Sequence, residues 1–185
     1  MSTPRRANRG PAAAADNRAA LLAAARTTFA EHGLDAPLSL VARTAGVGQG
    51  SLYRHFPNRE AIIVAVFEEN IGQLEDLVAN HESTLDELLD QIYTQLTGAV
   101  GLFEFLQPAD SSDPRLSAVI TRMHALLATE LADDTHRGSI RADVTAGDIF
   151  LAVGMLGALL NKTPEAERAR VAQRSWALLL RALRH

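Results

Sequence analysis

The sequence predicts an all-α fold, and two observations support this prediction. Apolar residues recur at spacings of three and four along most of the chain, as on the buried face of an amphipathic helix. No stretch alternates apolar and polar residues as a half-buried strand does, and no segment repeats. The 185 residues are 47% hydrophobic and 22% charged, which is typical of a globular protein with one domain or two small ones.

A flexible arm and a first helix are expected at the N-terminus. Residues 1–15 are low in complexity and lack a periodic apolar face. From Asn17 the pattern becomes helical, and Gly33 stands where a glycine commonly ends a helix. The apolar stripe of this helix consists of Leu21, Leu22, Ala25 and Phe29.

Two short helices joined by a glycine turn are expected next. Ser39 is a favourable N-cap for a helix over 40–45, which Gly46 can end. A second short helix is expected over 49–55, before a proline. This layout is that of a helix-turn-helix, whose second helix fits the DNA major groove. An ordinary helical hairpin that touches nothing has the same spacing, and that alternative stays open at this point.

Further helices are expected along the rest of the chain. Asn58 can cap a long helix, and the spacing of Thr145 and Asp148 resembles a capping box at the start of another. Thr163 followed by Pro164 is typical of the start of a last helix. Apolar stripes indicate helices over 62–77, 85–96 and 116–131, and a short helical piece is expected over 100–106.

Charge is distributed unevenly along the chain. Residues 1–60 carry eight arginines and four acidic residues, a net charge of +4, whereas residues 61–185 carry ten basic and eighteen acidic groups, a net charge of −8. The overall charge of −4 therefore conceals a basic N-terminal third, which indicates a polyanionic partner at that end. The arm arginines either enter a DNA minor groove or belong to a solvated tail. They are Arg5, Arg6 and Arg9.

The composition also bears on cofactors and location. The absence of cysteine removes disulfides, Cys-type zinc sites, iron–sulfur clusters and thiol nucleophiles. The histidines show no metal-ligand spacing, so no metal and no cofactor is expected. The longest apolar run, 149–160, is shorter than the ~20 residues of a membrane span, and no secretory signal is evident. A cytoplasmic protein without membrane contact is therefore expected.

Two stretches of the N-terminal third share their pattern with a known family. One is Ala-Ala-x-x-x-Phe-x-x-x-Gly at 24–33, and the other is LVARTAGVGQGSLYRHFPNREAIIVAVF, which begins at Leu40. Together they closely resemble the DNA-binding domain of the TetR family of bacterial transcriptional regulators. Gly48 departs from the family's common Ser or Thr, which removes a side-chain cap from the following helix. Arg59 stands where the family usually has lysine, so the positive charge is kept.

The resemblance implies which side chains touch DNA. Gln49 and Ser51 occupy positions where the family commonly contacts base edges, and glutamine can pair with adenine through two hydrogen bonds. Arg43 can reach a guanine or a phosphate. Four further residues occupy positions where the family usually touches phosphates, namely Ser39, Tyr53, His55 and Arg59. Plain surface exposure is the alternative for each of these side chains.

The resemblance also implies two domains and a regulatory role. We expect a DNA-binding domain over 1–58 and an effector-binding and dimerisation domain over 59–185. The implied protein is a homodimeric repressor that a small molecule releases from a palindromic operator. Two recognition helices about 34 Å apart can contact successive major grooves, which explains why a dimer would suit a palindrome. The apolar helices expected near 146–160 and 164–183 are the predicted dimer surface.

An effector cavity is expected among the long helix after Asn58 and the helices near 85–96, 116–131 and 145–160, with a largely apolar ligand. Its candidate walls are Leu74, Tyr93, Leu96, Phe103, Met123 and His124. For His124 and Tyr93 the alternative is an ordinary place in the core.

Two other functional classes stay open. A helical enzyme is not expected, because no Ser/His/Asp or paired-carboxylate arrangement is recognisable by spacing. An architectural DNA-binding protein would have no effector and little sequence preference. Activation of transcription stays open as an alternative to repression.

Overall fold

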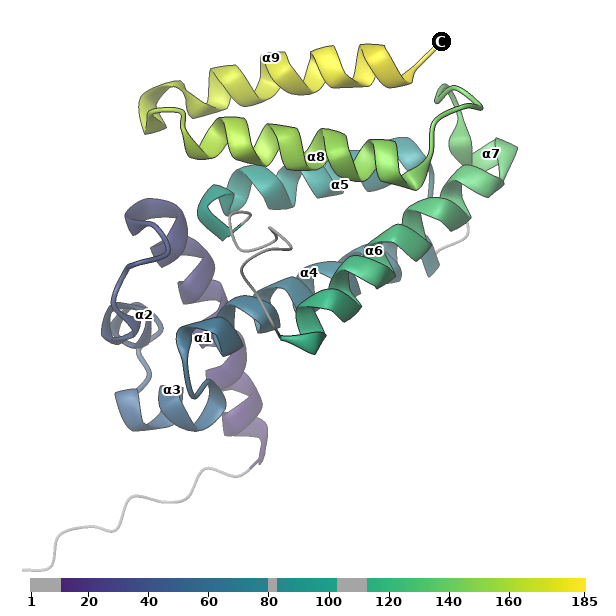
Figure 1. The fold of residues 1–185 in the computed structure, drawn as a ribbon. Helices are drawn as coiled ribbons and strands as arrows, with labels where there is room; N and C mark the ends of the chain where they lie inside the picture. The colour runs from purple at the N-terminus through teal and green to yellow at the C-terminus, as the bar shows by residue number, and fades with distance from the viewer. Residues whose placement is uncertain (1–10, 80–82, 103–112) are drawn as a thin grey trace, which may run out of the picture.

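The computed structural model describes residues 11–79, 83–102 and 113–185, and all the named elements in these ranges are helices. The predicted all-α fold is thus confirmed (Figure 1). In chain order the helices are α1 (Pro11–His32), α2 (Leu38–Thr44), α3 (Gln49–His55), α4 (Arg59–Ala79), α5 (Leu85–Gly98), α6 (Pro114–Ala132), α7 (Asp134–Arg137), α8 (Ala146–Asn161) and α9 (Glu165–Leu183).

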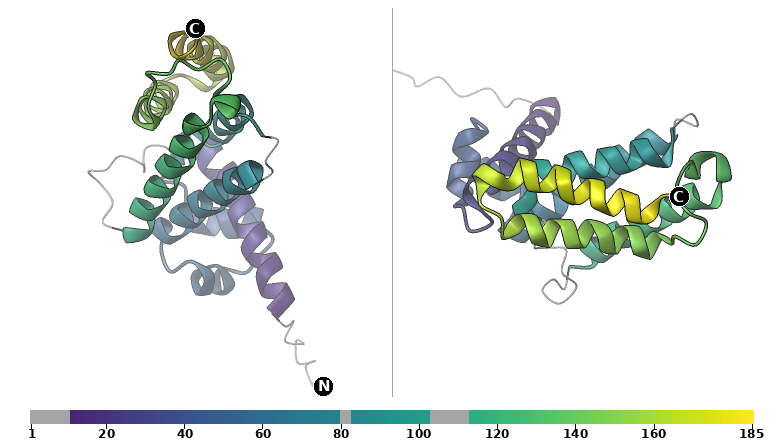
Figure 2. Two further views of the ribbon diagram at one scale, coloured as in Figure 1. Left: turned by 90° about the vertical axis from the view of Figure 1, so that its right-hand side faces the viewer. Right: turned by 90° about the horizontal axis from the view of Figure 1, so that it is seen from above.

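The helices form an N-terminal unit and a larger helical bundle that share α4. Helices α1, α2 and α3 pack against one another at one end of the molecule, and α4 leads from them into the bundle (Figure 1). Helices α8 and α9 run antiparallel, side by side, along the outer side of the bundle (Figure 2). One cluster of buried apolar residues extends from Leu21 in α1 to Leu183 in α9. The core therefore continues across residue 58, where the predicted domain boundary lies.

Three of the predicted helix caps are present. The amide oxygen of Asn58 accepts the backbone N–H of Ala61 at 2.8 Å, at the start of α4. Thr145 and Asp148 form the predicted capping box of α8. The hydroxyl and backbone N–H of Thr145 donate to Asp148 and hold the pKa of that carboxyl below its ordinary value. Gly46 has φ of +65°, the left-handed conformation expected of a glycine that follows a helix.

The structure corrects the start of α1. This helix begins at Pro11, so residues 11–15 belong to a helix and not to the predicted arm. Proline is favourable in the first turn, and the alanines that follow have the highest helix propensity. Arg5, Arg6 and Arg9 lie outside the described residues.

Two predicted N-caps are also corrected. Pro37 occupies the N-cap of α2, so Ser39 lies inside the helix and makes no cap bond. Pro164 occupies the N-cap of α9. The hydroxyl of Thr163 instead donates to the carbonyl of Leu159 at 2.8 Å, at the end of α8. In both cases the helix begins directly after a proline, whose fixed φ suits the N-terminal boundary.

The short elements differ from the prediction as well. Helix α7 was not predicted, because four residues are too few to show a helical period. Its N-cap is Asp133, whose carboxylate accepts the N–H groups of Thr135 and His136. Residues 100–102 form a short 3₁₀ turn, and the rest of the predicted 100–106 piece lies outside the described residues.

No helix in the described ranges is both long and apolar enough to cross a membrane.

Candidate nucleic-acid interface and ligand cavity

The turn between α2 and α3 is built by two glycines with different tasks. At Gly46 the positive φ reverses the chain, and the N–H of Val47 then donates to the carbonyl of Ala42 at 2.9 Å. Gly48 has an extended conformation at the N-cap of α3 and forms no side-chain cap bond, as the sequence predicts. Leu52, fully buried, fixes α3 to the core of the N-terminal unit. The opposite side of α3 is consequently left at the surface.

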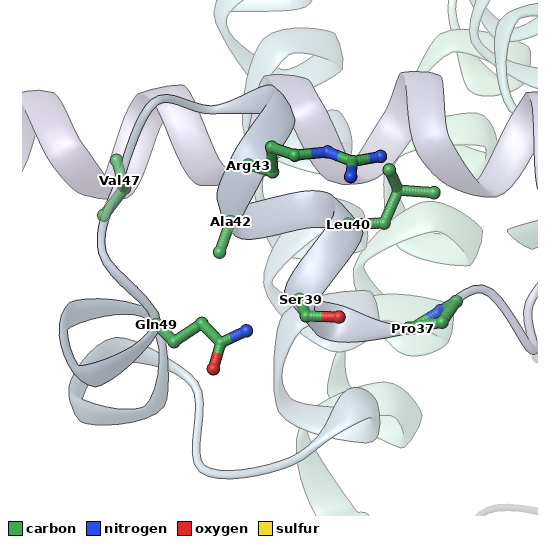
Figure 3. A pocket seen from close by; sticks show the side chains of 7 residues that line it. All are labelled: Pro37, Ser39, Leu40, Ala42, Arg43, Val47 and Gln49. Atoms are coloured by element: carbon green, nitrogen blue, oxygen red, sulfur yellow. The ribbon is translucent and has the colours of Figure 1, made fainter.

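A hollow of 530 Å³ lies between α2 and α3, and it gathers three of the predicted DNA contacts (Figure 3). Ser39, Arg43 and Gln49 line it, and each is exposed. The amide of Gln49 extends from α3 toward α2 (Figure 3). Apolar side chains complete the hollow, namely those of Pro37, Leu40, Ala42 and Val47. This surface therefore offers hydrogen-bonding groups beside apolar ones, as the edge of an A·T pair requires.

Three other predicted contacts differ in their exposure. Tyr53 is an exposed aromatic residue of α3, with 52% of its surface accessible. Ser51 and His55 are half-buried. These three do not line the hollow, but they lie on the same short helix as Gln49.

Arg59 is turned toward the protein itself. Its guanidinium donates to the carbonyls of Ala36 at 2.8 Å and Asp35 at 3.3 Å. It also lies over the ring of Phe29, 5.9 Å from the ring centre. Arg59 therefore ties the first turn of α4 to the segment before α2. Part of its donor capacity is already used, and its contact with phosphate stays a prediction.

A second cavity, of 540 Å³, lies among α4, α5, α6 and α8. These are the four helices that the sequence analysis assigned to an effector cavity. The polar lining consists of Asn70, Gln95, Asn161 and Lys162. The remaining lining is apolar or glycine: Phe67, Ile71, Ile92, Val119, Ile120, Met123, Leu127, Phe150, Leu151, Val153, Gly154, Met155, Gly157 and Ala158.

Met123 is the predicted wall residue that lines this cavity. Leu74 and Leu96 are fully buried and belong to the packed core instead. The ring of Tyr93 stacks on Trp176 at 5.4 Å, and that of His124 lies 4.7 Å from the ring of Phe150. Phe103 lies outside the described residues. Residues of the same apolar stripe of a helix can therefore either fill the packed core or line the cavity.

The sequence predicts that α8 borders the cavity, but none of the predicted wall residues lies on this helix. Helix α8 is apolar on almost its whole circumference, and its side chains were interpreted as part of a dimer surface. A helix that is apolar all round can be covered on more than one side. On α8, Leu151 and Met155 both line the cavity and are exposed at the surface, whereas Leu159 is exposed and does not line the cavity.

Polar contacts link the cavity wall to the N-terminal unit. Arg26 of α1 donates to the amide oxygen of Asn70 in α4 at 3.1 Å and pairs with Glu69 at 3.3 Å. The amide of Gln95 in α5 donates to the backbone carbonyl of Asn70 at 3.1 Å. Asn70 and Gln95 both line the cavity. The wall is therefore connected by hydrogen bonds to a helix of the helix-turn-helix unit.

An ion pair fixes α6 against α4. Arg122 donates through Nε to Glu75 at 2.8 Å, and a second bond joins its terminal nitrogen to the other carboxylate oxygen. Hydrogen bonding to Arg122 holds the pKa of the Glu75 carboxyl below its ordinary value, and the same bond raises the pKa of Arg122. Both side chains are about 40% exposed, so solvent screens this pair.

The fold and the α2–α3 surface define the class of this protein: an N-terminal helix-turn-helix, a motif typical of DNA-binding proteins, joined to a larger helical bundle. The family described as bacterial regulatory proteins, tetR family, matches residues 21–66. A TetR transcriptional regulator from Streptomyces coelicolor shares 32% sequence identity over 90% of this chain and 98% of its own, with a TM-score of 0.65. A TetR regulator from Mycobacterium vanbaalenii shares 28% identity over 94% of this chain and 98% of its own, also with a TM-score of 0.65.

A curated relative matches the N-terminal part only. The fatty acid metabolism regulator protein of Bacillus subtilis (strain 168) is 37% identical over 54 residues. The match spans 29% of this chain and 28% of that protein's own length. Taken with the matches over nearly the whole chain, these findings show that the protein belongs to the TetR family of bacterial transcriptional regulators, and hence that it is a DNA-binding regulator of transcription.

Proposed function

We propose that the protein is a homodimeric repressor that leaves a palindromic operator when a largely apolar ligand fills the α4–α8 cavity. The observation that carries this proposal is the position of α4. Its first turn is bonded to the segment before α2 through Arg59, and its middle lines the cavity through Phe67, Asn70 and Ile71. A ligand that moves α4 would therefore act on both units.

For DNA binding we propose that α3 enters the major groove. Gln49 contacts a base edge, with Ser51 as a second candidate on the same helix. Ser39, Arg43, Tyr53 and His55 then lie within reach of the DNA backbone, where such contacts position the protein without specifying sequence. The exposure of Gln49 and Tyr53, and the hollow between α2 and α3, support this arrangement.

For ligand control we propose a change in population between two conformations. The ligand must bind the conformation that fits DNA poorly more tightly than the other, because only differential affinity shifts an equilibrium. The link from Asn70 to Arg26 offers a physical route, since displacement of Asn70 would disturb a contact with α1. Reciprocity then requires DNA to weaken ligand binding by the same factor.

For dimerisation we propose the exposed face of α8 and α9. Leu151, Met155 and Leu159 form an exposed apolar stripe along α8, and Leu178 of α9 is also exposed. Gly154 and Ala158 lie between the side chains of the α8 stripe, so a partner helix could approach closely. All of these α8 residues except Leu159 also line the cavity, so the proposed interface would border the cavity. Members of this family bind DNA and small molecules and typically form dimers, which supports the same assembly.

Selection of binding sites from random-sequence DNA, followed by an in vitro transcription assay, tests this function. The proposal predicts an inverted repeat whose half-sites lie about one helical turn, or about 34 Å, apart. It also predicts lower transcription when that repeat overlaps a promoter. A single asymmetric site, a pool without consensus, or increased transcription would contradict the proposed repressor.

A further inference from the structure

We infer that the ligand of the α4–α8 cavity is a long apolar chain that ends in an anion, and that Lys162 binds the anionic end. This inference rests on the proposed function and names the chemical class of its ligand. It follows from the charge of the cavity lining, from the distribution of polar groups along the cavity, and from the position of Lys162.

Among the described residues that line the cavity, the only charge is positive. Lys162 is the charged member, and no aspartate or glutamate is among the described lining residues. A cationic ligand would therefore meet an uncompensated positive charge and no partner, whereas an anion would find a donor with a full charge. The other polar members are the amides of Asn70, Gln95 and Asn161, which can also donate hydrogen bonds.

The polar groups gather at one end of an elongated space. The α8 lining extends from Phe150 to Lys162, about 18 Å at the rise of an α-helix. Its polar members lie in the last turn of α8 or directly after it. On α5, which runs beside α8 in the same direction (Figure 1), Gln95 follows Ile92 by one turn.

Asn70 belongs to that polar end, because its carbonyl accepts the amide of Gln95. The far end is formed by apolar side chains such as Leu127 and Phe150. One polar end and one apolar end match a molecule with a charged head and an apolar tail.

Lys162 itself is unusual in this chain. It is the only lysine in the sequence, and the other 17 of the 18 lysine and arginine residues are arginines. It is exposed, directly after the last residue of α8, so its flexible side chain can reach into the cavity or into solvent. The ion pairs among the described residues do not include it. Its ammonium is therefore available to a ligand without breaking an existing pair.

Titration calorimetry with ligands of equal chain length tests the inference on the full-length protein. Dodecanoate, dodecanol and dodecyltrimethylammonium share a twelve-carbon chain and carry a negative, a neutral and a positive head group, respectively. We expect dodecanoate to bind about tenfold more tightly than dodecanol, the strength of a charge-assisted hydrogen bond. We expect the cation to bind more weakly than either. Dodecanoyl-coenzyme A distinguishes a terminal carboxylate from coenzyme phosphates as the source of the anion.

Variants assign the preference to Lys162. Lys162→Met should remove the preference for dodecanoate and leave the affinity for dodecanol unchanged, whereas Lys162→Arg should keep most of the preference. Arg170→Met removes an exposed positive charge that does not line the cavity, so it should alter neither affinity. Equal binding of dodecanoate and dodecanol to the unmodified protein, or an undiminished preference in Lys162→Met, would overturn the inference.

Chemical labelling gives an independent measurement, because the chain holds only one side-chain amine. An N-hydroxysuccinimide ester should acylate Lys162, and bound dodecanoate should slow that reaction at least severalfold, as followed by mass spectrometry. Labelling of Lys162 at the same rate with and without saturating dodecanoate would contradict the inference. Binding and operator release by dodecanol without any preference for the anion would overturn the assignment of Lys162 and leave the proposed function standing.

Discussion

We propose that Gln49 is the side chain of α3 that distinguishes one base pair from another. It is exposed, lines the hollow between α2 and α3, and carries an amide that can donate and accept at adenine. Gln49→Ala should therefore cost roughly 1 to 3 kcal/mol of binding free energy on the selected operator and little on random DNA. Fluorescence anisotropy with both DNAs measures the difference.

Tyr53→Phe is the matched control for Gln49→Ala. Its hydroxyl is proposed to touch phosphate, so the substitution should weaken both complexes by a similar factor. Because the hydroxyl carries no charge, the dependence of affinity on salt should not change. Equal losses on both DNAs for Gln49→Ala would show that another residue contacts the bases.

Arg59 stabilises the contact between α4 and the segment before α2, and this structural role can be measured separately from a contact with phosphate. Arg59→Met removes the bonds to Ala36 and Asp35 and should lower operator affinity by releasing α4 from the segment before α2. If Arg59 acts only through this contact, the slope of log affinity against log salt should stay the same. A slope reduced by about one would show instead that Arg59 neutralises a phosphate.

The two kinds of site differ in how far the sequence could predict them. The helix-turn-helix is a local motif, so Gly46, Gln49 and Tyr53 could be placed by their spacing alone. The residues that line the cavity cannot be found in this way, because they depend on how the helices pack and on which part of each apolar face is left without a neighbouring helix. Met123 lines the cavity, whereas Leu74 fills the core, and Asn70 carried no periodic signal because it is a buried polar residue.

At the level of helices, α4 connects the two units through polar contacts with α1. Arg26→Met would leave the amide oxygen of Asn70, a buried residue, without its donor. We expect the free energy of unfolding to fall by about 1 to 3 kcal/mol, the range for a lost hydrogen bond to a charged group. Urea denaturation measures this change.

Asn70→Asp is the control for the contact between α1 and α4. It keeps an acceptor for Arg26 and makes the bond charge-assisted, so it should preserve the link. A loss below about 0.3 kcal/mol in Arg26→Met, within the scatter of surface substitutions, would show that the contact does not hold α1 to α4.

The helix boundaries show where local signals suffice. Asn58 and the Thr145–Asp148 pair were recognised because capping depends on a few neighbouring residues. The start of α1 at Pro11 was missed because an alanine-rich segment has no apolar stripe, although its helix propensity is high. The N-cap of α9 lies one residue later than predicted, at Pro164 and not at Thr163.

At the scale of the whole molecule, the exposed apolar stripe on α8 predicts self-association. Light scattering at micromolar concentration should give about twice 19.9 kDa. Leu159→Glu should shift the protein toward the monomer, because it places a charge on the stripe without lining the cavity. It should also weaken operator binding, since a monomer contacts one half-site.

Thr129→Glu is the matched control for the stripe, since it adds a charge at an exposed position of α6. It should leave the mass at that of the dimer. An unmodified protein that scatters as a monomer and still binds its operator tightly would contradict a dimer built on α8 and α9.

Filling the α4–α8 cavity is proposed to lower the affinity for DNA, and this effect can be tested without any ligand. Met123→Trp places a larger side chain in the cavity, whereas Ala125→Trp adds the same side chain at an exposed position of the same helix. The measurement is operator affinity by fluorescence anisotropy, with circular dichroism to verify that both variants are folded. We expect Met123→Trp to bind the operator at least about tenfold more weakly, a change of about 1.4 kcal/mol, and Ala125→Trp to bind as the unmodified protein does. A folded Met123→Trp variant with unchanged or increased operator affinity would contradict control of DNA binding through this cavity.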